Sequence, residues 1–352
     1  MPNCDLLIVG GKLMSDHTPR KLNQIRPIEQ VDEFLVVERI FSEDVRLPSV
    51  GLANIHAEVP NIEANKEKIL RACQIFKERG ANLAIFPEFC LSGYFWEDEA
   101  ACWPYMNEAV TENHRDWIDG TLKPLLENEF RLIIMNNLTR GPERKFYNTT
   151  FFVSRLDFDY LDPKISYNKV FLPAIEKTYT ETGQDDRLMV ESRQGFGRFG
   201  FTTCYDYLFT DLLREYSMGD DVDSIIQLAS WRAASLRDYP GMNVRSDLYY
   251  GELWDMVMAA SSATNQVWTI ACNAVGRHAI SGAAFWGGSG IWAPSGLKLI
   301  QASYFNEELL IVHNLDIHGE RQVELEDFDY GIDFRAIYKP MGDGRVFTRA
   351  VD

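Results

Sequence analysis

Strand patterns and helix patterns alternate along most of this chain, from residue 47 to residue 315. Residues 49–59 predict a strand, residues 62–79 an amphipathic helix, and residues 82–86 a buried strand. Shorter segments continue the alternation, with strands at 131–135, 147–153, 199–203, 224–228 and 267–272 and helices at 122–129, 206–216 and 246–264. Residues 289–292 and 297–300 flank an Ala-Pro-Ser-Gly turn and predict a β-hairpin. Because no linker or internal repeat interrupts this region, the pattern predicts one α/β domain.

The two ends of the chain do not share this pattern. Residues 1–46 are rich in charge and have no clear helical or strand period, so they are predicted to be an N-terminal extension of unknown role. Residues 316–352 are predicted to be a C-terminal extension that is available for packing at an oligomer interface.

Charge and composition exclude several classes of protein. The formal net charge of −17 repels phosphate backbones and anionic membranes, so no nucleic-acid or membrane partner is expected. No apolar run approaches the roughly 18 residues of a membrane-spanning helix. The run at residues 6–9 is too short for a signal peptide, and we therefore expect a cytoplasmic protein. The six cysteines and six histidines have no metal-ligand spacing, so we expect neither a metal nor a cofactor.

Three segments place a potentially reactive side chain directly after a predicted apolar strand. These side chains are Glu88 in AIFPEFCLSGY, Lys169 in ISYNKVFLPAIE and Cys204 in GFTTCYDYLF. In α/β enzymes the loops at strand ends carry the active site, because the sheet fixes the backbone while the side chain projects into a crevice. Each segment alone has an ordinary structural explanation, since free cysteines are usually buried apolar groups and isolated charges usually face solvent.

Taken together and in this order, the three segments resemble the motifs of the nitrilase superfamily of carbon–nitrogen hydrolases. The residues that carry the resemblance are Phe86-Pro87-Glu88 with Ser92-Gly93-Tyr94, Tyr167-Asn168-Lys169-Val170-Phe171-Leu172-Pro173 with Glu176 and Gly183, and Cys204-Tyr205-Asp206 with Arg214. The resemblance covers residues 47–315. It implies an α/β fold of four layers, an α-β-β-α sandwich, and a homodimer or larger homo-oligomer formed by helix packing across a two-fold axis. Phe171, where histidine is common, and Thr210-Asp211, where Pro-Glu is frequent, depart from the family pattern and bear on substrate preference.

The resemblance also implies a role for each reactive group. Cys204 is expected to attack a carbonyl carbon as a thiolate, favoured by Lys169 and by the helix that begins near residue 206. Glu88 is expected to move the protons. Lys169 and the backbone N–H of Tyr205 are expected to stabilise the oxyanion. Glu176 is expected to orient Lys169 or the attacking water, although a glutamate on a helix surface explains the same residue.

Substrate contacts are expected from aromatic residues and from a few polar groups near these motifs. The candidates are Tyr94, Trp96, Asn148, Trp231 and Arg232, with the ring of Tyr205 as a further aromatic wall. For the aromatic residues, packing in the core is the alternative. Arg232 or Arg237 could bind a substrate carboxylate through two hydrogen bonds.

The leading functional prediction is cysteine-dependent hydrolysis of a small amide or N-carbamoyl substrate, because Cys204-Tyr205-Asp206 resembles the amide-processing branches. True nitrilases commonly carry Cys-Trp-Glu, so nitrile hydrolysis is the second alternative. A binding or scaffold protein that keeps the fold without catalysis is the third. An ammonia-supplying domain of a synthetase would need a fused module, which these 352 residues do not leave room for.

Overall fold

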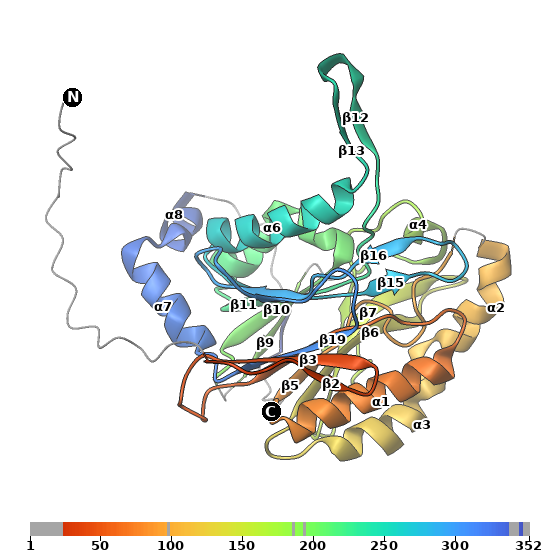
Figure 1. Cartoon of the computed structure of the whole chain (residues 1–352), viewed down its shortest axis with the longest axis horizontal. Coiled ribbons are helices and arrows are strands. Elements are labelled where there is room, and N and C mark those ends of the chain that lie inside the picture. Colours follow the sequence, from red (N-terminus) through yellow and green to blue (C-terminus); the bar gives the residue numbers. More distant parts are fainter. Residues whose placement is uncertain (1–23, 97–98, 185–186, 193–194, 338–344, 348–352) are drawn as a thin grey trace, which may run out of the picture.

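Two β-sheets face one another at the centre of the computed structural model (Figure 1). The structure describes residues 24–96, 99–184, 187–192, 195–337 and 345–347. The apolar run at residues 6–9 lies outside the described residues. No helix in the described ranges combines the length and the apolar content that crossing a bilayer requires.

Among the described residues, the first sheet has nine strands in the order β1-β3-β19-β4-β5-β6-β7-β8, with β2 paired to β3. Their bounds are Gln24–Ile25 (β1), Glu29–Val31 (β2), Phe34–Ile40 (β3), Val50–Asn54 (β4), Leu83–Ile85 (β5), Leu132–Arg140 (β6), Phe146–Ser154 (β7), Tyr167–Asn168 (β8) and Glu308–His313 (β19). Strands β4, β5 and β6 are parallel neighbours, so their carboxyl ends meet at one edge of the sheet.

The second sheet, within the described ranges, has seven strands in the order β18-β17-β14-β11-β10-β9-β20. Their bounds are Leu188–Glu191 (β9), Arg198–Thr203 (β10), Ser224–Ala229 (β11), Trp268–Asn273 (β14), Gly290–Trp292 (β17), Lys298–Gln301 (β18) and Arg345–Phe347 (β20). Strands β10, β11 and β14 are parallel. Strands β17 and β18 pair antiparallel, which confirms the hairpin predicted at residues 289–300.

Helices cover the outer faces of both sheets (Figure 1). The α-helices are Ile62–Glu78 (α1), Glu99–Ala109 (α2), Arg115–Trp117 (α3), Glu176–Tyr179 (α4), Thr210–Arg214 (α5), Tyr249–Asn265 (α6), Ile317–Asp327 (α7) and Tyr330–Ile337 (α8). Short 3₁₀ helices span Thr111–His114, Lys123–Leu125, Cys204–Leu208 and Pro240–Met242, and π-helical turns span Ile118–Leu122 and Glu215–Gly219. The helix predicted at residues 122–129 ends at Leu125, so residues 126–129 are not helical. The helix predicted at 206–216 is a mixture of short helical turns.

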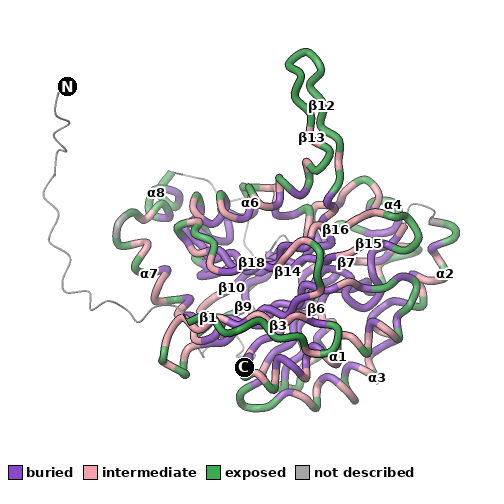
Figure 2. The backbone as a smooth tube through the Cα atoms, in the orientation of Figure 1, coloured by how far each residue is buried: buried purple, intermediate pink, exposed green. Residues whose placement is uncertain are grey.

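The central strands of both sheets are buried (Figure 2). Alternation along each central strand divides the buried side chains into three clusters. In β4 and β5, Leu52 and Ile85 point between the sheets, whereas Ala53 and Ala84 face the cluster that includes α1. In β11, Ile226 points between the sheets, whereas Ile225 faces the cluster that includes α6. Since successive strand residues point to opposite faces, one sheet can contact both the other sheet and a helical layer. The fold is an α-β-β-α sandwich, as predicted.

Helix α1 illustrates how the sequence sets these layers. The side chain of Asn61 caps the helix by accepting a hydrogen bond from the backbone N–H of Ala64 at 3.2 Å. A Cβ at Gly51 in β4 would lie 2.5 Å from the ring of Phe76, so glycine allows the helix to pack directly on the sheet.

Residues 24–46 of the predicted N-terminal extension include strand β3, although the sequence showed no strand period there. Strand β3 pairs in parallel with β19, and Phe34 and Val36 are buried in the core. The missing signal has a physical cause: Glu38 is buried in this strand and forms ion pairs with Arg26 and Arg79. At the other end, β20 pairs with β9 and adds an edge strand to the second sheet.

A β-hairpin rises from the body of the molecule just before α6 (Figure 1). Its strands are Arg237–Tyr239 (β12) and Val244–Ser246 (β13). They pair with each other and with no other described strand. Helix α6 consequently begins at Tyr249 and not at residue 246 as predicted. A second ribbon, Val275–Arg277 (β15) with Ala284–Trp286 (β16), lies at the same end of the sandwich.

Candidate active site

The three predicted reactive residues come together where strands of the two sheets end. Glu88 follows β5, Lys169 follows β8 and Cys204 follows β10. A fourth residue, Ser230, follows β11 and hydrogen-bonds to Glu88 through both its backbone N–H and its hydroxyl group. The segment after each strand is therefore positioned by the sheet that precedes it.

Lys169 forms a buried double ion pair with two carboxylates. Its Nζ lies 2.9 Å from Oε1 of Glu88 and 2.7 Å from Oε1 of Glu176, and all three side chains are fully buried. The backbone around Lys169 is fixed on both sides, because its N–H donates to Asn148 and its carbonyl accepts from Gly183. A Cβ at Gly183 would lie 2.2 Å from the carbonyl oxygen of Asn168, so this contact requires glycine.

Two neutral side chains complete the hydrogen bonds of the carboxylates. The amide of Asn148 donates to Oε1 of Glu88 at 2.8 Å and to Oε2 of Glu176 at 3.1 Å. The hydroxyl of Tyr94 donates to Oε1 of Glu176 at 2.8 Å. These donors stabilise two like charges that burial would otherwise destabilise.

The electrostatics of the cluster keep Lys169 charged. Burial alone lowers the pKa of this ammonium, but the carboxylates of Glu176 and Glu88 outweigh it and hold the pKa well above its usual value. Burial raises the pKa of Glu176, with Lys169 acting in the opposite direction. An ammonium with a raised pKa is a permanent positive charge at neutral pH.

Cys204 lies in a strained turn between β10 and a 3₁₀ helix. Its backbone has a φ of 49°, in the left-handed region that non-glycine residues seldom adopt. Its carbonyl accepts a hydrogen bond from the side chain of Gln227 at 2.9 Å. Phe89, directly after Glu88, has a φ of 53°. A left-handed residue costs about 1–3 kcal/mol, which the surrounding hydrogen bonds must offset.

Burial raises the pKa of the Cys204 thiol well above its usual value, and the negative charge of Glu88 raises it further. Lys169 lowers this pKa, but it also forms ion pairs with two carboxylates, and its effect is smaller than the combined effect of burial and Glu88. The direction of this pKa is therefore opposite to the one that attack as a thiolate implied. The expected helix near residue 206 is also different, because Cys204 itself begins a 3₁₀ helix of five residues.

Asp206 links the loop of Cys204 to the loop of Lys169. Its Oδ2 accepts from the N–H of Thr203 at 2.9 Å and from the hydroxyl of Tyr167 at 2.7 Å. Its Oδ1 accepts from the N–H of Phe171 at 2.7 Å. Burial raises the pKa of Asp206 to about 6, whereas Lys169 and these donors act to lower it.

A cavity of about 290 Å³ opens beside Cys204. Its walls are mostly apolar or aromatic, and its lining residues are Tyr94, Pro173, Ala174, Ile175, Cys204, Tyr205, Leu208, Ser230, Trp231, Arg232 and Tyr250. Small-molecule sites usually combine such walls with a few polar groups, and this volume is at the lower end of their range.

The structure separates the predicted substrate-binding residues into two groups. Tyr94, Trp231 and Arg232 line the cavity, as does Tyr205. Trp96 does not line it but stacks on Tyr105 and packs against the core, which was the alternative for an aromatic residue.

Asn148 is fully buried and does not line the cavity, and its amide instead joins the carboxylates of Glu88 and Glu176. The N–H of Tyr205 lies in the first turn of the 3₁₀ helix, where backbone donors have no partner within the helix.

Sequence reasoning missed two residues of the site. Ser230 contributes a backbone N–H, which has no side-chain signature, although its place at the end of a strand was a usable signal. Tyr250 reaches the cavity from the start of α6, after the β12–β13 hairpin, and its carbonyl accepts a hydrogen bond from the indole of Trp231. No local sequence pattern indicates that contact.

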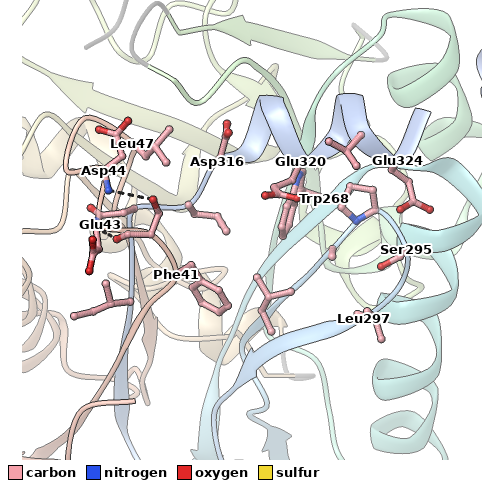
Figure 3. A pocket seen from close by; sticks show the side chains of 18 of the residues that line it. Phe41, Glu43, Asp44, Leu47, Trp268, Ser295, Leu297, Asp316, Glu320 and Glu324 are labelled. Atoms are coloured by element: carbon pink, nitrogen blue, oxygen red, sulfur yellow. Dashed lines mark hydrogen bonds between the residues drawn. The ribbon is translucent and has the colours of Figure 1, made fainter. Parts of the chain in front are cut away.

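A larger cavity, of about 1060 Å³, lies elsewhere in the molecule (Figure 3). Its walls include Phe41 and Trp268, and Glu43, Asp44 and Glu324 are among its acidic residues. It contains none of the reactive residues above and no cationic side chain within the described part of the chain. We therefore assign the candidate site to the cavity beside Cys204. Among the described residues, no three His, Cys, Asp or Glu side chains are grouped so that they could bind a metal.

Comparison with known proteins places this chain in a family. Residues 48–323 match the family model described as carbon–nitrogen hydrolase. Comparison with the curated proteins gives no match.

Several solved structures share the fold. Nit3 from Saccharomyces cerevisiae, a member of branch 10 of the nitrilase superfamily, is 20% identical, with a TM-score of 0.63 over 81% of this chain and 96% of that chain. An amidase from Nesterenkonia sp. is also 20% identical, with a TM-score of 0.60 over 80% of this chain and 95% of that chain. Glutamine-dependent NAD⁺ synthetase from Acinetobacter baumannii is 20% identical, with a TM-score of 0.58 over 75% of this chain, which spans only 44% of that protein. The match to the family model covers most of the sequence, and the chain belongs to the carbon–nitrogen hydrolase family.

Proposed function

We propose that this protein hydrolyses a carbon–nitrogen bond in a small amide or N-carbamoyl substrate, with Cys204 as the nucleophile. The observation that carries this proposal is the position of Cys204 in the cavity wall next to a buried cluster of Glu88, Lys169 and Glu176. Amide hydrolysis needs a nucleophile, a group that moves protons and a stabiliser for the oxyanion, and this cluster contains one candidate for each.

In the first half of the reaction, Glu88 takes the proton from the Cys204 thiol while the sulfur attacks the carbonyl carbon. The raised pKa of Cys204 supports a transfer that is concerted with attack, because a free thiolate would be costly in this buried site. The tetrahedral intermediate then collapses. Its carbon–nitrogen bond breaks, Glu88 gives the proton to the leaving nitrogen, and ammonia or an amine departs from a thioester.

In the second half, water attacks the thioester. Glu88 takes a proton from the water and delivers it to the departing sulfur, which restores the Cys204 thiol and releases the acid. The two halves use the same carboxylate in the same protonation state, so no proton is gained or lost by the enzyme over one cycle.

Lys169 and the backbone N–H of Tyr205 stabilise the oxyanion in both halves. A charged donor in a water-poor site commonly contributes a few kcal/mol to such an intermediate. Glu176 and Asn148 act as positioning residues, because Glu176 accepts a hydrogen bond from Lys169 and Asn148 donates to both carboxylates, and neither lines the cavity. The ammonium of Lys169 forms ion pairs with both Glu176 and Glu88, so Glu176 helps to fix its position.

Amide and N-carbamoyl substrates are favoured over nitriles by the Cys204-Tyr205-Asp206 sequence, which resembles the amide-processing branches. Ammonia release from matched panels of small amides, ureido compounds and nitriles tests this assignment. We expect turnover of the first two classes by the wild type and none by Cys204→Ala. Turnover of nitriles alone would replace the proposal with a nitrilase. The absence of turnover on all three panels, together with an unreactive Cys204, would favour a binding protein.

A further inference from the structure

The cavity beside Cys204 contains one permanently charged side chain among the residues that line it, and that side chain is Arg232. Its guanidinium lies over the ring of Tyr94, 5.9 Å from the ring centroid. Within the part of the chain that the structure describes, no carboxylate lies within ion-pair distance of Arg232, and its side chain makes no hydrogen bond. A guanidinium has five N–H donors in a planar fork that fits a carboxylate.

The backbone that carries Arg232 is fixed on both sides. The N–H of Trp231 donates to the side chain of Asn273 at 2.8 Å, and its carbonyl accepts from Trp286 at 2.9 Å. The N–H of Ala233 donates to the carbonyl of Ala284 at 2.9 Å. Arg232 itself forms a β-bridge with Phe285. A cation on a fixed backbone loses less conformational entropy when a ligand binds than one on a mobile loop.

Tyr94 relates this cation to the reactive cluster. Its hydroxyl donates to Glu176 inside the cluster, while Arg232 lies over its ring. The cluster has two carboxylates and one ammonium, so its formal charge is negative when both glutamates are ionised. In that state a negatively charged cluster contacts the hydroxyl of Tyr94, while a cation lies over the ring of the same residue in the cavity wall. A substrate with an uncharged reacting group and a separate anionic group is bound in a single orientation by such a field.

We propose that the substrate carries a carboxylate at the end remote from the scissile carbon–nitrogen bond, and that Arg232 binds this carboxylate. This inference rests on the proposed function and specifies its substrate class as monoamides of short dicarboxylic acids or N-carbamoyl amino acids. The uncharged amide or ureido carbonyl faces Cys204. The spacer between the two groups lies along the aromatic wall formed by Tyr94 and Trp231.

Matched substrates test the proposal. Succinamate and glutaramate differ from butyramide and valeramide only in that a carboxylate replaces a methyl group. We expect the wild type to prefer the anionic member of each pair in kcat/KM. In Arg232→Gln this preference falls by about 10- to 100-fold, the usual effect of losing a charge-assisted pair, and the loss is mainly in KM. Arg232→Lys, which keeps the charge without the fork, gives an intermediate preference.

Arg237→Gln is the matched control, because Arg237 is exposed on the β12–β13 hairpin, lies over the ring of Tyr249 and does not line the cavity. It should leave the preference unchanged. Equal hydrolysis of both members of each pair by the wild type would overturn the inference. So would a fall in both rates by the same factor in Arg232→Gln.

A binding experiment separates this inference from the proposed function. Glutarate should protect Cys204 of the wild type from iodoacetamide, and the protection should be lost in Arg232→Gln. This readout needs no turnover. Protection without hydrolysis of any amide or ureido compound would retain the carboxylate site and refute the proposed function. Hydrolysis of neutral amides without protection by glutarate would retain the proposed function and refute the carboxylate site.

Discussion

Ser230 and Glu88 hydrogen-bond to one another twice. The backbone N–H of Ser230 donates to Oε2 of Glu88 at 2.8 Å, and its hydroxyl donates to the backbone carbonyl of Glu88 at 2.8 Å. Glu88 follows β5 of the first sheet, whereas Ser230 follows β11 of the second. The two sheets are therefore joined at the reactive carboxylate, which keeps its position without any help from a substrate.

Replacement of Cys204 by alanine or serine should abolish turnover and leave the fold intact. Neither replacement supplies a thiol, and both side chains are small and unbranched, so they tolerate the backbone of this turn. We expect a loss in kcat of at least about a thousandfold and a change in unfolding free energy below about 1 kcal/mol. Ammonia release and thermal unfolding measure the two quantities. Substantial turnover by the alanine variant would refute the role of Cys204.

Glu88→Gln should block formation of the thioester, because an amide cannot accept the thiol proton. The substitution also has a structural cost. Lys169 and Asn148 donate to one oxygen of Glu88 and Ser230 donates to the other, so the new NH₂ group must face a donor. An unsatisfied buried donor costs about 1–3 kcal/mol. Intact-mass spectrometry after mixing with substrate detects the thioester, and its accumulation in this variant would contradict the prediction.

Lys169→Ala should raise the pH at which Cys204 reacts with iodoacetamide. The ammonium lowers the thiol pKa, so its loss leaves burial and the carboxylates unopposed. The rate of labelling as a function of pH gives the shift. Lys177→Ala is the control, because Lys177 is an exposed lysine outside the cluster. An unchanged or lower labelling pH in Lys169→Ala would show that Lys169 does not act on Cys204.

Asp206 should give activity and stability opposite dependences on pH. Its pKa in the folded protein is about 6, above the value of about 3.9 for an unfolded chain. The group therefore favours the folded state most below the unfolded pKa, and this contribution is lost as the pH rises through 6. Relative to Asp206→Asn, the wild type should lose up to about 1.4 kcal/mol per pH unit in this window.

Activity should change in the other direction. Only the ionised carboxylate accepts all three hydrogen bonds that link the Cys204 and Lys169 loops, so kcat should fall as the pH drops below about 6. Unfolding in urea and kcat, measured at the same pH values for both proteins, test the two trends. Parallel changes in stability and activity would argue against this role for Asp206.

The protein should form a dimer or a larger homo-oligomer. Large apolar side chains are exposed on α6 and on the β12–β13 hairpin, including Met256, Tyr239 and Met242. Exposed apolar groups of this kind often mark protein interfaces. Light scattering at micromolar concentration measures the mass, and Met256→Lys should shift it toward the monomer. A monomeric wild type would contradict the prediction.

The sequence predicted the parts of the molecule that depend on strand periodicity. The alternation of strands and helices predicted an α/β domain, whereas the four layers came from the resemblance to a family. Glu88, Lys169 and Cys204 could be singled out because their surrounding motifs, taken together, carry that resemblance. Strand β3 was missed because buried Glu38 resembles a surface charge until its ion pairs with Arg26 and Arg79 are known.

The direction in which a side chain points could not be predicted from the sequence. Trp96 and Trp231 are both aromatic and both lie near a motif, yet one packs in the core and the other lines the cavity. Asn148 was predicted to contact the substrate, but its amide donates hydrogen bonds to Glu88 and Glu176 instead. The raised pKa of Cys204 could not be predicted either, since it depends first on burial and then on the positions of Glu88 and Lys169.

The left-handed backbone at Cys204 restricts the evolutionary routes open to this protein. β-branched residues are strongly disfavoured at positive φ, so threonine and valine do not fit this turn without rearranging it. If a hydroxyl nucleophile replaces the Cys204 thiol during evolution, serine fits the turn and threonine does not. Descendants that lose catalysis should accumulate alanine, serine, glycine or asparagine at this position, and their residue choice would record the geometry of the ancestral turn.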